Sequence, residues 1–376
     1  MHQLLLFCIL TTQFIYISII RVDPSVRDKI IIPLAVSFFA FFSAPIQGGL
    51  SDYYCRKKSI VFAMLINLVA SVFFVFWLLW HNVVYLIIYI LMLGIAGNVT
   101  PIAVSAFKDI TRKFMNFRFF VCMSLFYYFV GDYSQVVSKN FLEPNTLLII
   151  AFALVILCTI LVFFIFKDIK DRELPKRLSI REEFVYIYHN FLKHKYFIMG
   201  VIGYFFLEIS LYQFAFRSEV FDGFLSKVAP IEMISGAFLG MIFLKFSKIS
   251  DEKVFIYAIG ATFFCFLFLL LSQIFHLTNP IYSIALMLFF GFNYSLVYSC
   301  VYCLFTRKRH HHDHGKIFGI IESMDSLSYL VAIVIVYFLQ KVSPQTIWLI
   351  SLVFIIISII FFLRFLKHDK KVPHIT

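Results

Sequence analysis

Four carboxylates lie within long apolar stretches of this sequence, namely Asp132, Glu208, Glu322 and Asp325. A charged group in hydrocarbon is unfavourable, so such residues face a cavity or a partner and mark proton or substrate paths. Glu322 and Asp325 are three residues apart on one helix face, where two carboxylates cannot both ionise at low cost. We therefore expect proton coupling through at least one of the four acids. The alternative for Glu322 and Asp132 is hydration near a helix end.

Glu208 lies nearest the centre of its apolar stretch. Tyr204 and Tyr212 are each four residues away, so the three side chains share one helix face. This arrangement predicts that Tyr204 and Glu208 contact a substrate or a proton. The competing interpretation is a set of polar residues that hydrogen-bond between helices without touching any substrate.

Three further tyrosines, Tyr294, Tyr298 and Tyr302, recur at a spacing of four residues. They can form an aromatic wall for an organic cation, although helix packing with satisfied hydroxyls explains them equally well. Basic residues near the ends of apolar stretches, such as Arg118, need only snorkel to the interface. Since no Lys or Arg lies deep in an apolar stretch, we expect a neutral, zwitterionic or cationic cargo.

A histidine-rich tract is formed by His310, His311, His312, Asp313 and His314. Histidines at this density can bind zinc or respond to pH near neutrality. No cysteine or second histidine cluster accompanies the tract in the sequence, so a polar basic loop is the favoured interpretation. We predict no metal site and no cofactor, and keep the four histidines as weak metal candidates.

The elements that carry these residues are membrane helices. Of the 376 residues, 61% are hydrophobic and 14% are charged, and the mean hydropathy is +0.91. These values exclude a soluble globular domain. Dividing the apolar stretches into spans of about 20 residues predicts an all-α polytopic membrane protein with twelve transmembrane helices. The net charge of +12 comes from basic residues at the ends of spans, so nucleic acid is not an expected partner.

Charge also predicts topology. Most Lys and Arg residues fall in the even-numbered loops and the C-terminal tail, so these loops and both termini are predicted to be cytoplasmic. Residues 167–195 are predicted to form a cytoplasmic linker between two six-helix bundles, residues 1–166 and 196–376, the second with a short cytoplasmic tail. The high content of Phe, Ile and Lys is typical of an AT-rich bacterial genome and favours a bacterial inner membrane.

The two bundles are related at an offset of 195 residues. Aligned positions include Lys58 with Lys253, Asn98 with Asn293 and Thr111-Arg112-Lys113 with Thr306-Arg307-Lys308. Apolar identities are common among membrane helices, but polar identities at one shared offset are not. The sequence therefore predicts an internal repeat, in which Gln13 corresponds to Glu208.

A short charged loop from Gly48 to Lys58 joins two uncharged stretches. Its sequence, GGLSDYYCRKK, resembles the motif G-x-L-x-D-R-x-G-R-[RK] between helices 2 and 3 of the major facilitator superfamily. The matching residues are Gly48, Leu50, Asp52, Arg56 and Lys57, whereas Tyr53 replaces a basic residue and Cys55 a glycine. The alternative is an ordinary positive-inside hairpin.

The resemblance implies two six-helix bundles around a midplane substrate cavity, lined by helices 1, 4, 7 and 10. It assigns to this cavity Gln13, Asn98, Tyr204, Glu208, Asn293, Tyr294 and Tyr298. It also implies a conformational latch at the loop, formed by Gly48, Asp52, Arg56 and Lys57. Ile90 stands where the family often has an arginine in helix 4, so the family's arginine relay is not carried over.

The favoured function is secondary active transport of a small organic solute by alternating access. Proton-exchanging efflux and proton-driven uptake both stay open. A second hypothesis is a transporter-like receptor or assembly partner that no longer transports. A membrane-embedded enzyme is the least favoured, because the sequence contains no P-loop, nucleophile elbow or metalloprotease motif. The expected partners are a small-molecule substrate, protons and the lipid bilayer, and the expected state is a monomer.

Overall fold

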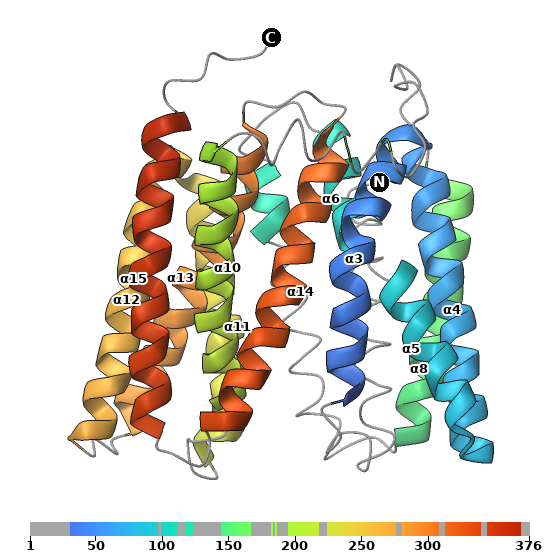
Figure 1. Ribbon diagram of the computed structural model, residues 1–376, viewed down its shortest axis with the longest axis horizontal. Helices are drawn as coiled ribbons and strands as arrows, with labels where there is room; N and C mark the ends of the chain where they lie inside the picture. Colours follow the sequence, from blue (N-terminus) through green and yellow to red (C-terminus); the bar gives the residue numbers. More distant parts are fainter. Residues whose placement is uncertain are drawn as a thin grey trace. The chain divides into compact units, whose positions relative to one another are not determined.

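The computed structural model describes residues 31–96, 99–110, 117–122, 144–166, 182, 185, 195–217, 224–275, 280–307, 313–339 and 344–369. The regular secondary structure of these residues is helical (Figure 1). The helices are α3 (Ile31–Tyr53), α4 (Arg56–Trp80), α5 (Val83–Ala96), α6 (Thr100–Ile110), α8 (Pro144–Ile165), α10 (Lys195–Arg217), α11 (Phe224–Phe246), α12 (Asp251–Ile274), α13 (Pro280–Thr306), α14 (His314–Leu339) and α15 (Pro344–Asp369).

Eight stretches among the described residues are long and apolar enough to cross a membrane. One of them, Val83–Asp109, combines α5 with α6. Two shorter apolar helices, Phe152–Ile165 and Met233–Phe246, lie within α8 and α11. The other two predicted spans, residues 3–20 and 114–137, fall wholly or largely outside the described residues.

Tight turns flank α4 at both of its ends. The helix before the charged loop ends at Tyr53 and the next begins at Arg56, so the hairpin is closed by two residues. At the other end of α4, His81 adopts a left-handed φ of 49°, and its backbone N–H donates to the Trp77 carbonyl. Asn82 completes this turn, because its side chain accepts a hydrogen bond from the Val84 N–H at 3.0 Å.

The chain forms two compact units. The first contains residues 1–112, 130–183 and 310–326, and the second contains residues 113–129, 184–309 and 327–376. Each unit thus includes a short segment from the opposite half of the sequence, and α14 begins in the first unit and ends in the second. The predicted linker at 167–195 stays a prediction, since nearly all of it lies outside the described residues.

In the first unit, α5 packs against α3 and α4, and α8 packs against α4 (Figure 1). The approach of α3 to α5 is close, because a Cβ on Gly94 would overlap the side chain of Phe39. At the same level the Ser43 hydroxyl donates to the Gly94 carbonyl at 2.5 Å. An aromatic cluster of Phe74 and Tyr89, with ring centroids 5.1 Å apart, fills the contact between α4 and α5.

In the second unit, the tightest pairs are α11 with α13 and α10 with α15. A Cβ on Gly236 would overlap the backbone of Leu288, so α11 and α13 touch at the main chain. Between α10 and α15, the Ser358 hydroxyl donates to the Gly203 carbonyl at 2.7 Å. Small residues and backbone-bonded hydroxyls are the contacts that hold helices together where hydrocarbon offers no hydrophobic driving force.

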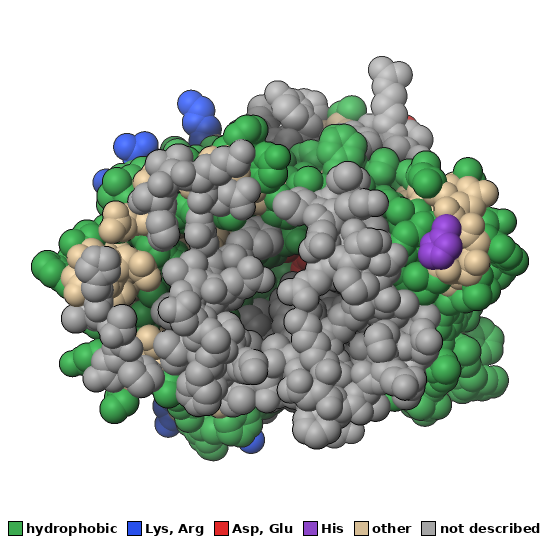
Figure 2. Space-filling view, turned by 90° about the horizontal axis from the view of Figure 1, so that it is seen from below, with side chains coloured by type: hydrophobic (Ala, Val, Ile, Leu, Met, Phe, Trp, Pro, Cys, Tyr) green, Lys and Arg blue, Asp and Glu red, His purple; other side chains and the backbone are tan. Residues whose placement is uncertain are grey.

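The outward faces of the helices are apolar. Large hydrophobic side chains are exposed on several helices, among them Phe62 on α4, Phe264 on α12 and Phe338 on α14, each more than 60% accessible. Figure 2 shows hydrophobic side chains over most of the described surface in its view. In water such surfaces would associate, whereas in a bilayer they contact acyl chains.

Candidate functional site

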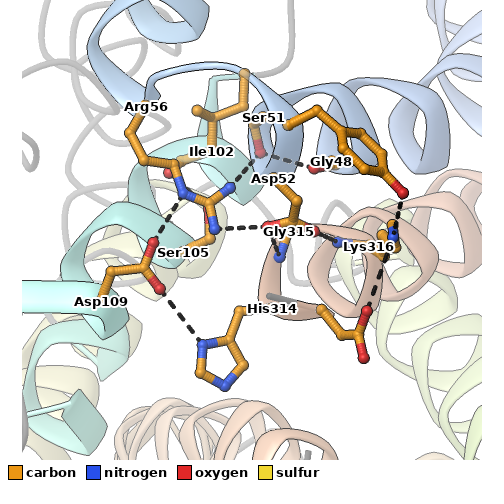
Figure 3. A network of polar contacts seen from close by, with 12 residues as sticks. Gly48, Ser51, Asp52, Arg56, Ile102, Ser105, Asp109, His314, Gly315 and Lys316 are labelled. Atoms are coloured by element: carbon orange, nitrogen blue, oxygen red, sulfur yellow. Dashed lines mark hydrogen bonds and ion pairs between the residues drawn. The ribbon is translucent and has the colours of Figure 1, made fainter. Parts of the chain in front are cut away.

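The charged turn between α3 and α4 places Asp52 against the start of α14 (Figure 3). Its Oδ1 accepts a hydrogen bond from the Gly315 N–H at 3.0 Å, and its Oδ2 accepts one from the Lys316 N–H at 2.9 Å. The side chain is fully buried. The first N–H groups of a helix have no acceptor within the helix, and the helix dipole favours an anion there. Asp52 therefore serves a neighbouring helix and not its own.

Glycines make this approach sterically possible. A Cβ on Gly48 would overlap the carbonyl oxygen of Gly315, and a Cβ on Gly315 would overlap that of Gly48. One turn further, a Cβ on Gly319 would overlap the carbonyl of Ala44. The two backbones are thus in direct contact over two turns, which brings the carboxylate of Asp52 within reach of the α14 amides.

Arg56 joins two carboxylates in this cluster (Figure 3). Its Nη2 lies 2.6 Å from Oδ1 of Asp52, and its Nε lies 2.9 Å from Oδ2 of Asp109. Its Nη1 donates to the Ser51 hydroxyl. The guanidinium is 1% exposed, so its charge is compensated by these partners and not by water. Charge-assisted bonds of this kind are stronger than neutral ones.

The cluster continues along the first turn of α14. Nδ1 of His314 lies 3.6 Å from Oδ1 of Asp109. Nζ of Lys316 donates to the Tyr53 hydroxyl at 3.0 Å, lies 4.7 Å from the Tyr53 ring centroid and is 3.7 Å from Oδ1 of Asp313. Tyr53, which departs from the family motif, therefore binds the cation of the neighbouring helix.

The structure brings together three of the four predicted latch residues, Gly48, Asp52 and Arg56. The fourth, Lys57, points elsewhere and lies 5.5 Å from the Phe163 ring centroid. The roles of Asp109 and Lys316 were not predicted from the sequence. A usable signal was present in Gly315 and Gly319, since small residues four apart at the start of a span mark close helix contact.

A second polar cluster surrounds Arg118, within the second unit. The Arg118 guanidinium donates to the carbonyl oxygens of Leu244 at 3.1 Å, Ser247 at 2.8 Å and Ile249 at 3.2 Å. It also binds Oδ1 of Asp251 at 2.9 Å. The residue is 3% exposed, so the expectation that it snorkels to water is wrong. The last carbonyls of a helix lack N–H partners within the helix, and Arg118 donates to Leu244 at the end of α11 and to Ser247 and Ile249 in the turn that follows.

The two clusters lie at corresponding positions of the predicted internal repeat. At the offset of 195 residues, Asp52 corresponds to Ser247 and Asp313 to Arg118. In the first cluster a loop acid binds the N–H end of a helix, whereas in the second a cation binds the carbonyl end of α11. The charge is inverted, and in both cases it has the sign that the helix dipole favours.

The predicted cavity residues are partly described. Tyr204 and Glu208 on α10 and Asn293 on α13 are buried, with exposures of 1%, 1% and 3%. The Asn293 amide donates to the Phe289 carbonyl of its own helix at 2.8 Å. On α14, Glu322 is 8% exposed and Asp325 is half-buried. Gln13, Asn98, Asp132, His310, His311 and His312 lie outside the described residues. That these residues share one cavity stays a prediction.

The tyrosine row on α13 is continuous. The ring centroids of Tyr294 and Tyr298 lie 6.1 Å apart, and those of Tyr298 and Tyr302 lie 4.8 Å apart. The hydroxyls of Tyr298 and Tyr302 are hydrogen-bonded at 3.1 Å. Tyr302 is buried, whereas Tyr294 and Tyr298 are half-buried. Among the described residues, no group of three or more His, Cys, Asp or Glu side chains could hold a metal ion.

The chain matches one protein family and resembles several solved structures in its fold. The family model described as Major Facilitator Superfamily matches residues 4–332. No curated protein matches the sequence. Among solved structures, the human organic anion transporter MFSD10 (TETRAN) has a TM-score of 0.76 at 11% identity, covering 97% of this chain and 98% of that one. The Escherichia coli fucose:proton symporter FucP has a TM-score of 0.75 at 14% identity, covering 96% and 98%.

A bacterial homologue of the iron transporter ferroportin, in an outward-facing state, has a TM-score of 0.69 at 12% identity and covers 97% of this chain and 99% of that one. These likenesses concern the fold. Together with the family match they confirm the predicted fold class, an all-α membrane protein of twelve helices.

The glycine contact leads to a stability prediction. Gly48→Ala forces a Cβ into the Gly315 carbonyl, and such overpacking costs about 1–3 kcal/mol, so we expect the Tm of the detergent-purified protein to fall by about 5 °C. Gly260→Ala is the matched control, because a Cβ at Gly260 meets no atom within 4 Å. An equal Tm for the two variants would show that α3 and α14 are not in backbone contact.

The Arg118 cluster predicts strong energetic coupling. Arg118→Met leaves Asp251 and three carbonyls without their donor, and removal of one buried partner costs about 3–5 kcal/mol. In a double-mutant cycle with Asp251→Asn, thermal or denaturant unfolding is expected to give a coupling of about 1 kcal/mol or more. The pair Arg307 and Glu252 serves as the control, because Arg307 is 36% exposed and exposed pairs couple weakly. Equal coupling in the two cycles would contradict the assignment.

Proposed function

Because the chain belongs to the major facilitator superfamily, a family of membrane transporters, we propose that it is a secondary active transporter that moves a small organic solute by alternating access. The observation that carries this proposal is the Asp52 cluster. It ties the end of α3 to the start of α14 through two amide hydrogen bonds, and Arg56 on α4 holds the carboxylate that accepts them. Any movement of α14 along or away from α3 must break both amide hydrogen bonds together.

In the proposed mechanism, the Asp52 cluster is a latch that stabilises one of two alternating states. A carboxylate at a helix N-terminus contributes about 0.3–2 kcal/mol, and two conformations separated by a few kcal/mol are both populated. The latch is therefore strong enough to bias the equilibrium and weak enough to open. Arg118, which holds the end of α11 and the start of α12, is proposed as the second closing contact.

Proton coupling is proposed to use Glu208, with Glu322 and Asp325 as further candidates. Glu208 is 1% exposed and lies in the middle of α10, where an ionised carboxylate is unfavourable unless it is paired or loses its charge. A group of this kind can carry a proton in one state and release it in another. The fucose symporter, whose fold this chain resembles, is coupled to protons, which supports the same assignment here.

The cargo is proposed to be neutral, zwitterionic or cationic. The fully buried Lys and Arg residues among those described are Arg56, Lys108, Arg118 and Lys316. All four lie at or near helix ends, and Arg56, Arg118 and Lys316 are occupied by the contacts of the two clusters. The described midplane region thus supplies Tyr294, Tyr298 and Glu208 but no cation for an anionic cargo.

We further propose a bacterial inner membrane as the location, cytoplasmic termini and a monomeric state. The non-transporting alternative rests on departures from the family pattern, among them Tyr53, Cys55 and the missing arginine at Ile90. Tyr53 lies in the latch, where its hydroxyl and ring both contact Lys316. This departure therefore supports a working latch and weakens the alternative.

The latch predicts faster local exchange in a charge variant. Asp52→Asn keeps the shape but loses the charge that holds the α14 amides and Arg56, a loss of about 1–2 kcal/mol. We expect hydrogen–deuterium exchange of the Gly315–Gly319 segment to accelerate about five- to thirty-fold. Glu252→Gln, which breaks a pair with the partly exposed Arg307, is the control and should leave this segment unchanged. Unchanged exchange in Asp52→Asn would argue against the latch.

Proton coupling predicts a separable phenotype for Glu208→Gln. A thermal-shift screen of neutral, zwitterionic, cationic and anionic solutes first identifies a stabilising solute. Vesicles that contain the protein and a pH-sensitive dye should then show solute-dependent proton movement, which Glu208→Gln abolishes while solute binding is kept. Glu252→Gln is again the control. Proton movement that persists in Glu208→Gln excludes Glu208 as the coupling site, and absence of flux with every binding solute would favour the non-transporting alternative.

A further inference from the structure

A groove of about 600 Å³ lies on the first unit, framed by α3, α4, α5 and α6. Its wall is mainly hydrocarbon, and the side chains that define its length and rim are Leu50, Tyr54, Lys58, Phe62, Ile66 and Ile95. The volume is within the range of pockets that hold a small-molecule ligand. Leu50, Phe62 and Ile95 are 43%, 63% and 54% exposed, so the groove opens on the apolar outer face and not toward the core.

Three of the five polar side chains in the wall donate to backbone carbonyls, and the other two, Tyr54 and Lys58, are exposed. The Ser43 hydroxyl donates to Gly94 at 2.5 Å, the Gln47 amide donates to Ile95, and the Ser59 hydroxyl donates to Cys55 at 3.4 Å. Since these three donors are already bound to carbonyls, the groove offers a ligand mainly apolar contacts. A groove that opens on the membrane-facing side and offers a hydrocarbon wall is suited to an acyl chain.

A positive charge at one end of the groove indicates which head group the ligand carries. Among the described residues that line the groove, Lys58 is the charged one, and it lies exposed in the first turn of α4. Its neighbours point away, since Arg56 is bound to Asp52 and Asp109, and Lys57 lies against Phe163. An ammonium group at the end of a membrane span attracts anionic lipid.

We infer that this groove is a binding site for an anionic phospholipid, with one acyl chain between α3 and α4 and the phosphate at Lys58. The bound lipid would contact Leu50 and Tyr54, which flank Asp52 on the same turn. The occupant is thus placed where it supports the α3–α4 hairpin. The site itself does not depend on the proposed transport function, because it rests on the groove and its charge.

Native mass spectrometry of the full chain tests this inference, with phosphatidylglycerol, phosphatidylcholine and inorganic phosphate as probes. We expect one phosphatidylglycerol to be retained under conditions that remove the others. Lys58→Gln should lower this retention about fivefold. Lys253→Gln is the matched control, because Lys253 is the repeat counterpart of Lys58, is also exposed and is likewise the third residue of its helix. This control should retain the lipid as the wild type does.

A second variant tests the hydrocarbon wall. Ile66 lines the groove and is half-buried, so Ile66→Trp places a larger side chain in the groove, and it should reduce retention of phosphatidylglycerol without lowering the Tm. Equal retention of the two lipids by the wild type, displacement of phosphatidylglycerol by inorganic phosphate, or full retention in Ile66→Trp would each overturn the inference. Equal losses in Lys58→Gln and Lys253→Gln would also overturn it, because they would indicate non-specific charge attraction.

Discussion

The hydrogen bonds between the Asp52 carboxylate and the first amides of α14 are the interaction on which the described site depends. A helix start presents N–H groups that its own helix cannot satisfy, and a buried carboxylate requires donors. Each group thus removes the cost of burying the other. The contact forms only because Gly48 and Gly315 let the two backbones touch. Arg56 then binds both Asp52 and Asp109, so backbone fit, hydrogen bonding and ion pairing meet at one point.

The second unit meets the same physical requirement with the opposite charge. Arg118 donates to the last carbonyls of α11, and Asp251 at the start of α12 balances its charge. Ser247, the repeat counterpart of Asp52, contributes its main-chain carbonyl. The second-half loop therefore lacks the Asp52 side chain, but its main chain still makes a polar contact at the corresponding position. The two clusters differ in which partner carries the charge, and the helix dipole favours either arrangement when the sign is right.

The fold class and the charged loop from Gly48 to Lys58 were predictable because hydropathy and charge are local properties of a sequence. Asp52 and Arg56 were predictable for the same reason, as members of a short motif. The roles of Asp109 and Lys316 were not, because they exist only where α6 and α14 meet the end of α3. Arg118 was misjudged because an arginine near the end of a span looks the same in sequence whether its partners are waters or carbonyl groups.

The proposed latch has to open and close, and this constrains where its charged groups can lie. Breaking a buried ion pair in hydrocarbon leaves an uncompensated charge, whereas near a helix end water can replace the lost partners. Asp52, Arg56 and Arg118 all lie at or beside helix ends, where opening exposes them to water and the two states can differ by only a few kcal/mol. Glu208 is buried in the middle of α10, away from the helix ends where water could replace a lost partner. Its charge must instead be met by a partner or removed by a proton, and this requirement ties its ionisation to the conformation around it.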